Sequence, residues 1–268
     1  MKHSTAKLQK WKYPVLYLTF FIISMLPLYT QRSYAAQDTQ NVIIGLLMKA
    51  TAPYQAFAPV FHVATIVLIA FIAWKPKWAG RMLSGYMALN YFIIAMVTGL
   101  GTTEQYGFVI HTGGLIMYAS IGFIWVLTTI RKELQVSFSS ASWKHLWLLP
   151  LALLAFWAPY ETKDNIVYPN FDPVLLLSSP DYGLTFCLTT PVFMFLLILF
   201  HPHVGRLAYR ITAFNGLLYG VYNLTLWFKP EFRWMGFLHV PLLMISGYAL
   251  MLAVIEEKRS GRRSKPTV

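Results

Sequence analysis

The sequence predicts an all-α protein, a polytopic bundle of about eight transmembrane helices. Three observations predict this class. Of the 268 residues, 57% are hydrophobic and only 12% are charged, about half the charge of an ordinary soluble domain. The apolar residues gather in runs long enough to cross a hydrocarbon core of roughly 30 Å. The lysines and arginines cluster in the connections between these runs, which is typical of proteins oriented in a bilayer.

The apolar runs define the predicted spans and their order along the chain. Each run is expected to be helical, because an isolated spanning segment must satisfy its own backbone hydrogen bonds inside the hydrocarbon. The predicted spans are 13–30, 57–74, 82–101, 107–130, 146–160, 183–200, 211–228 and 235–255. The fifth run is short and ends in Trp157, Pro159 and Tyr160.

The first 56 residues allow two interpretations. Residues 1–30 begin with basic side chains and continue into an apolar stretch, which suits a first span or signal-anchor. The same stretch, followed by Ser33, Tyr34 and Ala35, also resembles a secretory signal with a small-residue cleavage site. Residues 31–56 are expected to form an outer linker, with a short amphipathic piece on the membrane surface.

The basic residues orient the predicted spans. With the N-terminus placed in the cytoplasm, all lysines and arginines fall in cytoplasmic connections except Arg32, Lys49, Lys163, Lys229 and Arg233. This asymmetry is the one that the positive-inside rule describes. We therefore expect a bacterial plasma (inner) membrane protein with both termini cytoplasmic. Residues 131–182 then hold a linker helix and an outer loop, and residues 256–268 form a basic cytoplasmic tail.

Composition also excludes several classes of protein. The net charge of +12 is distributed among membrane-proximal turns, so it indicates orientation in a bilayer and not nucleic-acid binding. A single cysteine, Cys187, excludes an intramolecular disulfide framework and a multi-cysteine zinc motif. The sequence contains no GxSxG, HExxH, Walker or GxGxxG motif, so an enzyme is not expected.

Part of the sequence recurs, which indicates an internal duplication. A proline, a Gly-Arg pair, an alanine and an asparagine occur twice in the same order and, allowing one gap, with the same spacing. They are Pro76, Gly80, Arg81, Ala88 and Asn90, and then Pro202, Gly205, Arg206, Ala213 and Asn215. The match places residues 57–130 over residues 183–255 as parallel three-helix repeats, joined by a linker helix. The alternative is that any cytoplasmic helix hairpin favours such turn residues.

One segment resembles a known group of proteins. Residues 178–193 carry an aromatic-Gly-x-Thr-x-Cys-x-Thr-Thr pattern, formed by Pro180, Tyr182, Gly183, Thr185, Cys187, Thr189 and Thr190. This pattern is similar to that of an uncharacterised family of bacterial polytopic membrane proteins. The chain departs from it at Leu188, where that family usually has a second proline. The resemblance implies the membrane class and no activity.

Three asparagines are the candidate ligand-binding residues, because polar side chains inside spans are costly. Asn90 and Asn215 each lie nine residues beyond a basic turn, which is about 13 Å and close to the bilayer midplane. Two amides at equal depth in two repeats suit hydrogen bonding to a polar solute. Asn223, two turns further along, would extend the polar track. The alternative is that each amide bonds a neighbouring helix and contributes about 1 kcal/mol to packing.

A second constellation consists of His62, His111, Cys187 and His239, which lie four or five residues inside the outer ends of their spans. Three imidazoles and a thiolate would suit a zinc or copper ion, and two imidazoles would suit a haem. The alternative is that these histidines bond carbonyl groups near the interface, where the aromatic residues before them form the ordinary membrane belt.

These features favour a transporter or permease for a small polar or cationic solute, with a site between the two repeats. A membrane metal- or haem-binding protein is the first alternative. An accessory subunit of a membrane complex, or a homo-oligomer, is the second. In that case Gly113 and Gly114 would allow close contact with a partner helix.

Overall fold

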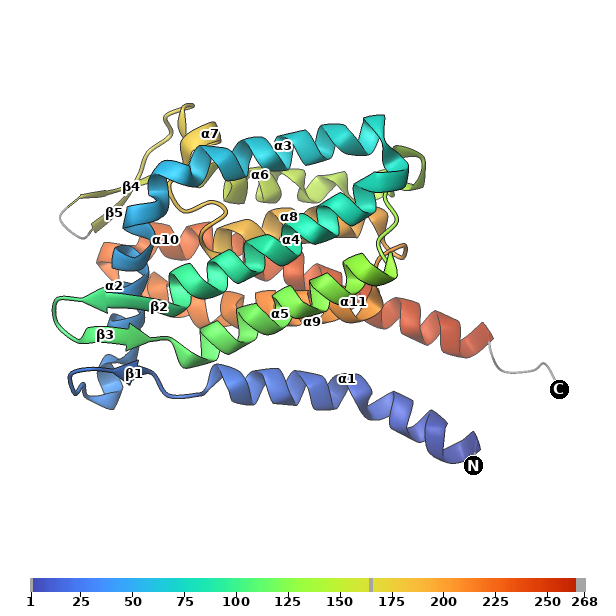
Figure 1. Ribbon diagram of the computed structural model, residues 1–268, viewed down its shortest axis with the longest axis horizontal. Coiled ribbons are helices and arrows are strands. Elements are labelled where there is room, and N and C mark those ends of the chain that lie inside the picture. Colours follow the sequence, from blue (N-terminus) through green and yellow to red (C-terminus); the bar gives the residue numbers. More distant parts are fainter. Residues whose placement is uncertain (1, 164–165, 264–268) are drawn as a thin grey trace.

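Helices build the computed structural model, which describes residues 2–163 and 166–263 of the chain. The longer ones lie side by side along the long axis of the molecule (Figure 1). These lengthwise helices are α1 (Lys2–Ser24), α3 (Ala58–Trp74), α4 (Pro76–Gly99), α5 (Thr112–Arg131), α6 (Leu149–Trp157), α8 (Phe186–Phe200), α9 (Arg206–Tyr222) and α11 (Val240–Arg263). The start of α1 and the end of α11 mark one end of the bundle, the terminal end, and the strands mark the other, the sheet end.

The helices have the length and composition of a membrane protein. In the described part of the chain, four helical segments are long and apolar enough to cross a membrane, namely Ala36–Trp74, Pro76–Gly99, Thr112–Arg131 and Pro230–Glu257. Large apolar side chains such as Val67 and Phe123 face outward, which suits lipid. The predicted helical membrane class is confirmed at this level. A crossing by each remaining apolar run stays a prediction.

The predicted span 107–130 was wrong in its first residues. Gly107–Ile110 form strand β3, and α5 begins only at Thr112. Strand β3 lies between β1 (Tyr29–Thr30) and β2 (Leu100–Thr103) in an antiparallel sheet. Gly107 permits the turn between β2 and β3, because its φ of +67° is rarely adopted by residues with a side chain.

The ends of other predicted spans also move. Span 183–200 begins as a helix only at Phe186. Span 211–228 becomes α9 followed by the 3-10 turn η5 (Asn223–Phe228). Span 235–255 is divided between α10 (Arg233–Leu238) and α11. Pro241 is the second residue of α11, a position at which its missing N–H interrupts no helical hydrogen bond.

The predicted amphipathic piece is helix α2 (Thr39–Thr51), which runs across the sheet end (Figure 1). It buries Val42, Leu46 and Ala50 in a small core shared with Val109 of β3. Gly101 allows this close approach, because a Cβ at that position would lie 2.6 Å from Leu46. The apolar face of α2 is therefore satisfied inside the protein.

The outer loop predicted before residue 182 contains regular structure. Strands β4 (Tyr160–Lys163) and β5 (Ile166–Pro169) form an antiparallel hairpin. The hairpin is followed by the short apolar helix α7 (Leu175–Ser178). The remaining 3-10 turns are η1 (Ala36–Asp38), η2 (Ala52–Phe57), η3 (Phe138–Ser140), η4 (Trp143–Leu148) and η6 (Pro230–Phe232).

At the terminal end, the linker after α5 covers both copies of the recurring Gly-Arg turn. A Cβ on Gly80 would collide with the carbonyl oxygen of Leu134, and a Cβ on Gly205 would lie 2.8 Å from the Glu133 carboxylate. The backbone N–H of Gln135 donates to the carbonyl of His203 at 3.0 Å. Both glycines therefore lie under the same linker. The predicted basic tail comprises residues 256–268. The side chains of Lys258 and of the residues after it are not among those that the structure describes.

The packing pairs the helices in the same order in two parts of the chain. Helix α4 packs along α3 and α5, and α9 packs along α8 and α11. We call α3, α4 and α5 the first half and α8, α9 and α11 the second half. Helix α1 packs against α5 and α9, and Gly113 of α5 lies under it, since a Cβ there would lie 2.7 Å from the carbonyl oxygen of Ile23. The glycine predicted to contact a partner thus contacts the chain's own first helix.

Candidate functional site

A buried segment without helical structure, residues 179–185, enters the bundle between α7 and α8. Ser179, Tyr182 and Leu184 are buried. Gly183 has a φ of +81°, and a Cβ there would run into the ring of Phe61 on α3. Only glycine fits this position without displacing Phe61. Backbone groups of such a segment need partners within the protein, because neither a helix nor water supplies them.

Asn90 of α4 supplies one of these partners. Its Nδ2 donates a hydrogen bond of 2.8 Å to the carbonyl oxygen of Gly183, and the N–H of Gly183 donates to Thr189 Oγ1 at 2.9 Å. Asn90 is fully buried. Its Oδ1 has no hydrogen-bond partner among the described residues. The amide thus holds the segment with one end and leaves a free acceptor at the other.

Asn215 of α9 also leaves a free acceptor. Its Nδ2 donates to Ile211 of the same helix at 2.8 Å, and its Oδ1 has no partner within the described chain. The next residue, Gly216, lies tightly against Ser246 of α11, whose hydroxyl is likewise buried and unpartnered there. The sequence prediction paired Asn90 with Asn215. In the structure both side-chain oxygens lack a partner among the described residues, and both amide nitrogens donate to a backbone carbonyl, in segment 179–185 for Asn90 and in the same helix for Asn215.

Asn223, the third predicted residue, lies beside the single cysteine. Its Nδ2 donates to Cys187 Sγ at 3.3 Å, and both residues are partly buried. This contact joins the start of α8 to the end of α9. The predicted ligand residue Asn223 and the predicted metal ligand Cys187 are therefore neighbours.

Aromatic rings from both halves meet next to these residues. Tyr118 of α5 stacks on Phe186 of α8 with ring centroids 4.8 Å apart, and both lie within 5.5 Å of the ring of Tyr219 on α9. Tyr91 of α4 packs on the same Phe186 ring at 5.9 Å. We call Tyr91, Tyr118, Phe186 and Tyr219 the aromatic cluster. Its members were not selected from the sequence, because aromatic residues are frequent in every apolar run.

The four predicted metal ligands do not form a common site. Both ring nitrogens of His62 lie beside backbone carbonyl groups, those of Ala58 at 2.9 Å and Phe156 at 3.1 Å. His239 Nδ1 lies 2.6 Å from the carbonyl oxygen of Met235. Within residues 2–163 and 166–263, no group of three or more His, Cys, Asp or Glu side chains is arranged to hold a metal ion. Nearby backbone carbonyl groups occupy the imidazoles of His62 and His239, whereas His111 Nδ1 is buried without a hydrogen-bond partner among the described residues.

His111 and His239 nevertheless occupy matching positions. Each directly precedes a long helix, α5 or α11. The carbonyl of His111 accepts a hydrogen bond from Leu115 N at 2.8 Å, and that of His239 accepts one from Leu243 N at 3.2 Å. The two histidines therefore begin corresponding helices of the two halves.

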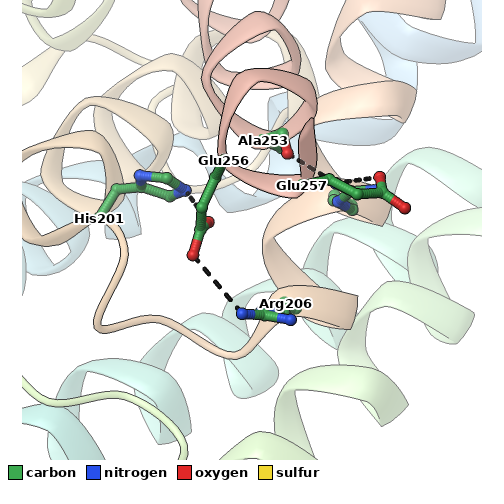
Figure 2. Close-up of polar contacts among 6 residues, drawn as sticks. His201, Arg206, Ala253, Glu256 and Glu257 are labelled. Carbon is green, nitrogen blue, oxygen red and sulfur yellow. Dashed lines mark hydrogen bonds and ion pairs between the residues drawn. The ribbon is translucent and has the colours of Figure 1, made fainter. Parts of the chain in front are cut away.

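An ionic cluster ties the second half together at the terminal end (Figure 2). Glu256 of α11 pairs with His201 Nε2 at 3.0 Å and with Arg206 at 3.6 Å. Arg210 donates to the Ala253 carbonyl at 2.6 Å and to Glu257 at 2.8 Å. We call these residues, His201, Arg206, Arg210, Glu256 and Glu257, the ionic cluster.

The ionic cluster has one buried cation and one titrating imidazole. The guanidinium of Arg210 lies over the ring of Tyr13 on α1 at 4.1 Å from its centroid, and Arg210 is buried. Burial lowers the pKa of His201, while the neighbouring Glu256 carboxylate opposes this shift. In the sequence, His201 stands in a turn beside Pro202 and His203. Its acidic partner was missed because the two residues are far apart in the chain.

Comparison with known proteins adds no relative. No protein-family model matches the chain, and comparisons with curated proteins and with solved structures find no match. The resemblance of residues 178–193 to a bacterial membrane family stays a prediction.

Proposed function

We propose that this protein is a transporter for a small polar or cationic solute, which binds between the first and second halves. The observation that carries the proposal is the pair of free acceptors on Asn90 and Asn215. Each side-chain oxygen is buried without a partner in the described structure, and leaving such a group unpaired costs about 1–3 kcal/mol. A solute with N–H or O–H donors would satisfy these oxygens and recover that cost.

The surroundings of these oxygens suit such a solute. The aromatic cluster lies where α4, α5, α8 and α9 meet, and it includes Tyr91, the residue after Asn90. Ring faces attract cations as well as flat solutes. We therefore propose that the aromatic faces form a second part of the solute path, beside the amide oxygens of Asn90 and Asn215.

The proposed duplication supports a path between the halves. Asn90 and Asn215 lie on α4 and α9, which have matching neighbours in the two halves. His111 and His239 begin matching helices, and Gly80 and Gly205 lie under one linker. Parallel repeats with a site at their interface are a common transporter architecture. We further propose that eight helices cross a bacterial plasma membrane with both termini cytoplasmic.

Uptake into proteoliposomes tests the proposal. The purified protein is reconstituted, and radiolabelled amines, amino acids, polyols and sugars are screened with empty vesicles as the background. We expect saturable uptake of at least one solute class. Asn90→Ala and Asn215→Ala are each expected to raise the half-saturating concentration about tenfold, the effect of losing one hydrogen bond to a buried acceptor.

A matched variant separates site effects from general damage. Asn41→Ala removes an exposed amide oxygen that accepts a hydrogen bond from Lys229 at 2.7 Å. It should leave uptake unchanged. Uptake that is unaltered in the Asn90→Ala, Asn215→Ala double variant would exclude the proposed solute site.

A further inference from the structure

Asp181 is the acidic residue of segment 179–185; it is partly buried, and it was not singled out as a site from the sequence. Its backbone carbonyl accepts hydrogen bonds from Leu184 N at 3.1 Å and Thr185 N at 3.0 Å, so it forms the turn that leads into α8. Its neighbours Ser179 and Tyr182 are fully buried. The carboxylate is therefore attached to backbone that has little freedom to move.

Neutral donors surround the Asp181 carboxylate. The hydroxyl of Tyr160, on β4, donates to Oδ2, and Gln55 Nε2, on η2, donates to Oδ1 at 3.4 Å. The Thr51 hydroxyl, at the end of α2, donates instead to the Leu47 carbonyl of its own helix at 3.0 Å. Tyr160 and Thr51 are themselves buried. The carboxylate thus receives hydrogen bonds from two elements of the sheet end, β4 and η2.

Charge compensation is missing at this carboxylate. Among the side chains that the structure describes, no lysine, arginine or histidine lies within ion-pair distance of Asp181. The titratable groups around it are Tyr160 and, on its own segment, Tyr182, whose hydroxyl bonds Thr65 of α3 at 3.0 Å. Neither carries a charge at neutral pH. Burial raises the pKa of Asp181, and the hydrogen bonds from Tyr160 and Gln55 oppose the rise.

The same segment connects Asp181 to the solute site. Gly183, two residues further along, accepts the hydrogen bond of Asn90. When a proton binds one carboxylate oxygen, an O–H bond forms and that oxygen becomes a donor. The Tyr160 hydroxyl can then accept from that oxygen, so that its hydrogen bond reverses, whereas Gln55 Nε2 can only donate and its hydrogen bond to a protonated oxygen weakens. Such a change alters the hydrogen bonds that hold segment 179–185 in place. It thereby affects the Gly183 carbonyl, which accepts the hydrogen bond of Asn90.

We propose that Asp181 is a proton-binding site whose occupancy is coupled to the solute site at Asn90 through segment 179–185. The physiological role of this coupling rests on the proposed transport function. The proton comes from water at the sheet end and returns to it, so no other reactant is needed. A bound proton fits this geometry better than a metal cation, because Tyr160 and Gln55 present donors to the carboxylate and not lone pairs.

Infrared titration of the purified full-length protein tests the proton site without any solute. We expect a carboxyl group that protonates well above about pH 3.9, the ordinary aspartate midpoint. Its band should disappear in Asp181→Asn and persist in Asp172→Asn, which changes an exposed aspartate of the same loop. Tyr160→Phe removes a donor to the carboxylate and should raise the midpoint by about one pH unit. This variant also tests the site if Asp181→Asn does not fold.

The coupling has its own matched pair of variants. Asn90→Ala releases the Gly183 carbonyl, which admits water to the segment and should lower the Asp181 midpoint by about one pH unit. Asn215→Ala removes an equally buried amide that does not touch the segment and should leave the midpoint unchanged. Equal shifts in these two variants would overturn the coupling.

Two further results would overturn the proton site itself. One is a titrating band that survives Asp181→Asn. The other is a midpoint that moves when sodium chloride replaces choline chloride, which would show a metal-cation site. Because the titration needs no solute, a normal titration together with absent uptake would contradict the transport proposal alone.

Discussion

Asn90 donates its side-chain hydrogen bond to the backbone carbonyl of Gly183, a residue 93 positions further along the chain. This bond joins the middle of α4 to the non-helical segment before α8. It satisfies a backbone carbonyl that no helix satisfies, and the side-chain oxygen of Asn90 is left buried without a partner in the described structure. The solute proposal and the proton proposal both depend on this contact.

Gly183→Ala should destabilise the protein strongly. The positive φ and the contact with Phe61 together predict a loss of about 2–4 kcal/mol, from backbone strain and overpacking. Thermal unfolding in detergent, followed by circular dichroism, measures it. Gly45→Ala is the control, because a Cβ there meets nothing within 4 Å and should slightly stabilise α2. Equal melting temperatures for the two variants would contradict the strained backbone and close packing described for Gly183.

Thr212→Val should weaken the contact between the two halves. Trp125 Nε1 on α5 donates to Thr212 Oγ1 on α9 at 3.0 Å, and both side chains are fully buried. The substitution leaves the indole N–H unpaired, at a cost of about 1–3 kcal/mol. Thr102→Val, at an exposed strand position, should change stability by less than about 0.5 kcal/mol. Denaturant titration of both variants gives the comparison.

Arg210→Ala and Glu257→Gln should differ in their effects. Arg210 is buried and loses the Ala253 carbonyl, Glu257 and the Tyr13 ring, so its removal should cost about 2–4 kcal/mol. The side chain of Glu257 is 55% exposed, so its neutralisation should cost less than about 1 kcal/mol. Equal losses in melting experiments would mean that the ion pair itself, and not burial of the guanidinium, stabilises this end.

Stability should fall on acidification through the ordinary titration range of histidine, near pH 6.5. The pKa of His201 is lowered in the folded protein, so the unfolded chain binds more protons in this range and acid favours unfolding. His201→Gln should flatten the dependence of melting temperature on pH between about 5 and 7.5. Glu256→Gln should steepen it, because the neighbouring carboxylate favours the charged imidazole. A wild-type protein that melts higher in acid would contradict the lowered pKa.

Several features were predictable because they are local. Helix α3 follows the predicted span 57–74 almost residue for residue, since an unbroken apolar run allows little other than a helix in hydrocarbon. The amphipathic piece of the linker became α2 for a similar reason. The predicted pairing of Asn90 with Asn215 in one site rested on equal spacing from a recurring turn and stays a prediction; both side-chain oxygens are buried and without a partner in the described structure.

Other features depended on contacts between distant residues. Residues 107–110 are apolar enough for a span, yet they pair with Leu100–Thr103 as a strand and are covered by α2. His62, His111, Cys187 and His239 have similar depth in the sequence, but depth alone does not specify which helix faces turn together, and carbonyl groups occupy two of the imidazoles.

The sequence by itself determined where this chain is apolar, where its cations gather and which turns recur, because those properties belong to short stretches of neighbouring residues. Only the tertiary structure decided that Asn90 holds Gly183, that Glu256 reaches His201, and that Asp181 receives its donors from Tyr160 and Gln55. Such pairings depend on how helices pack and rotate against one another, and no local pattern encodes that rotation.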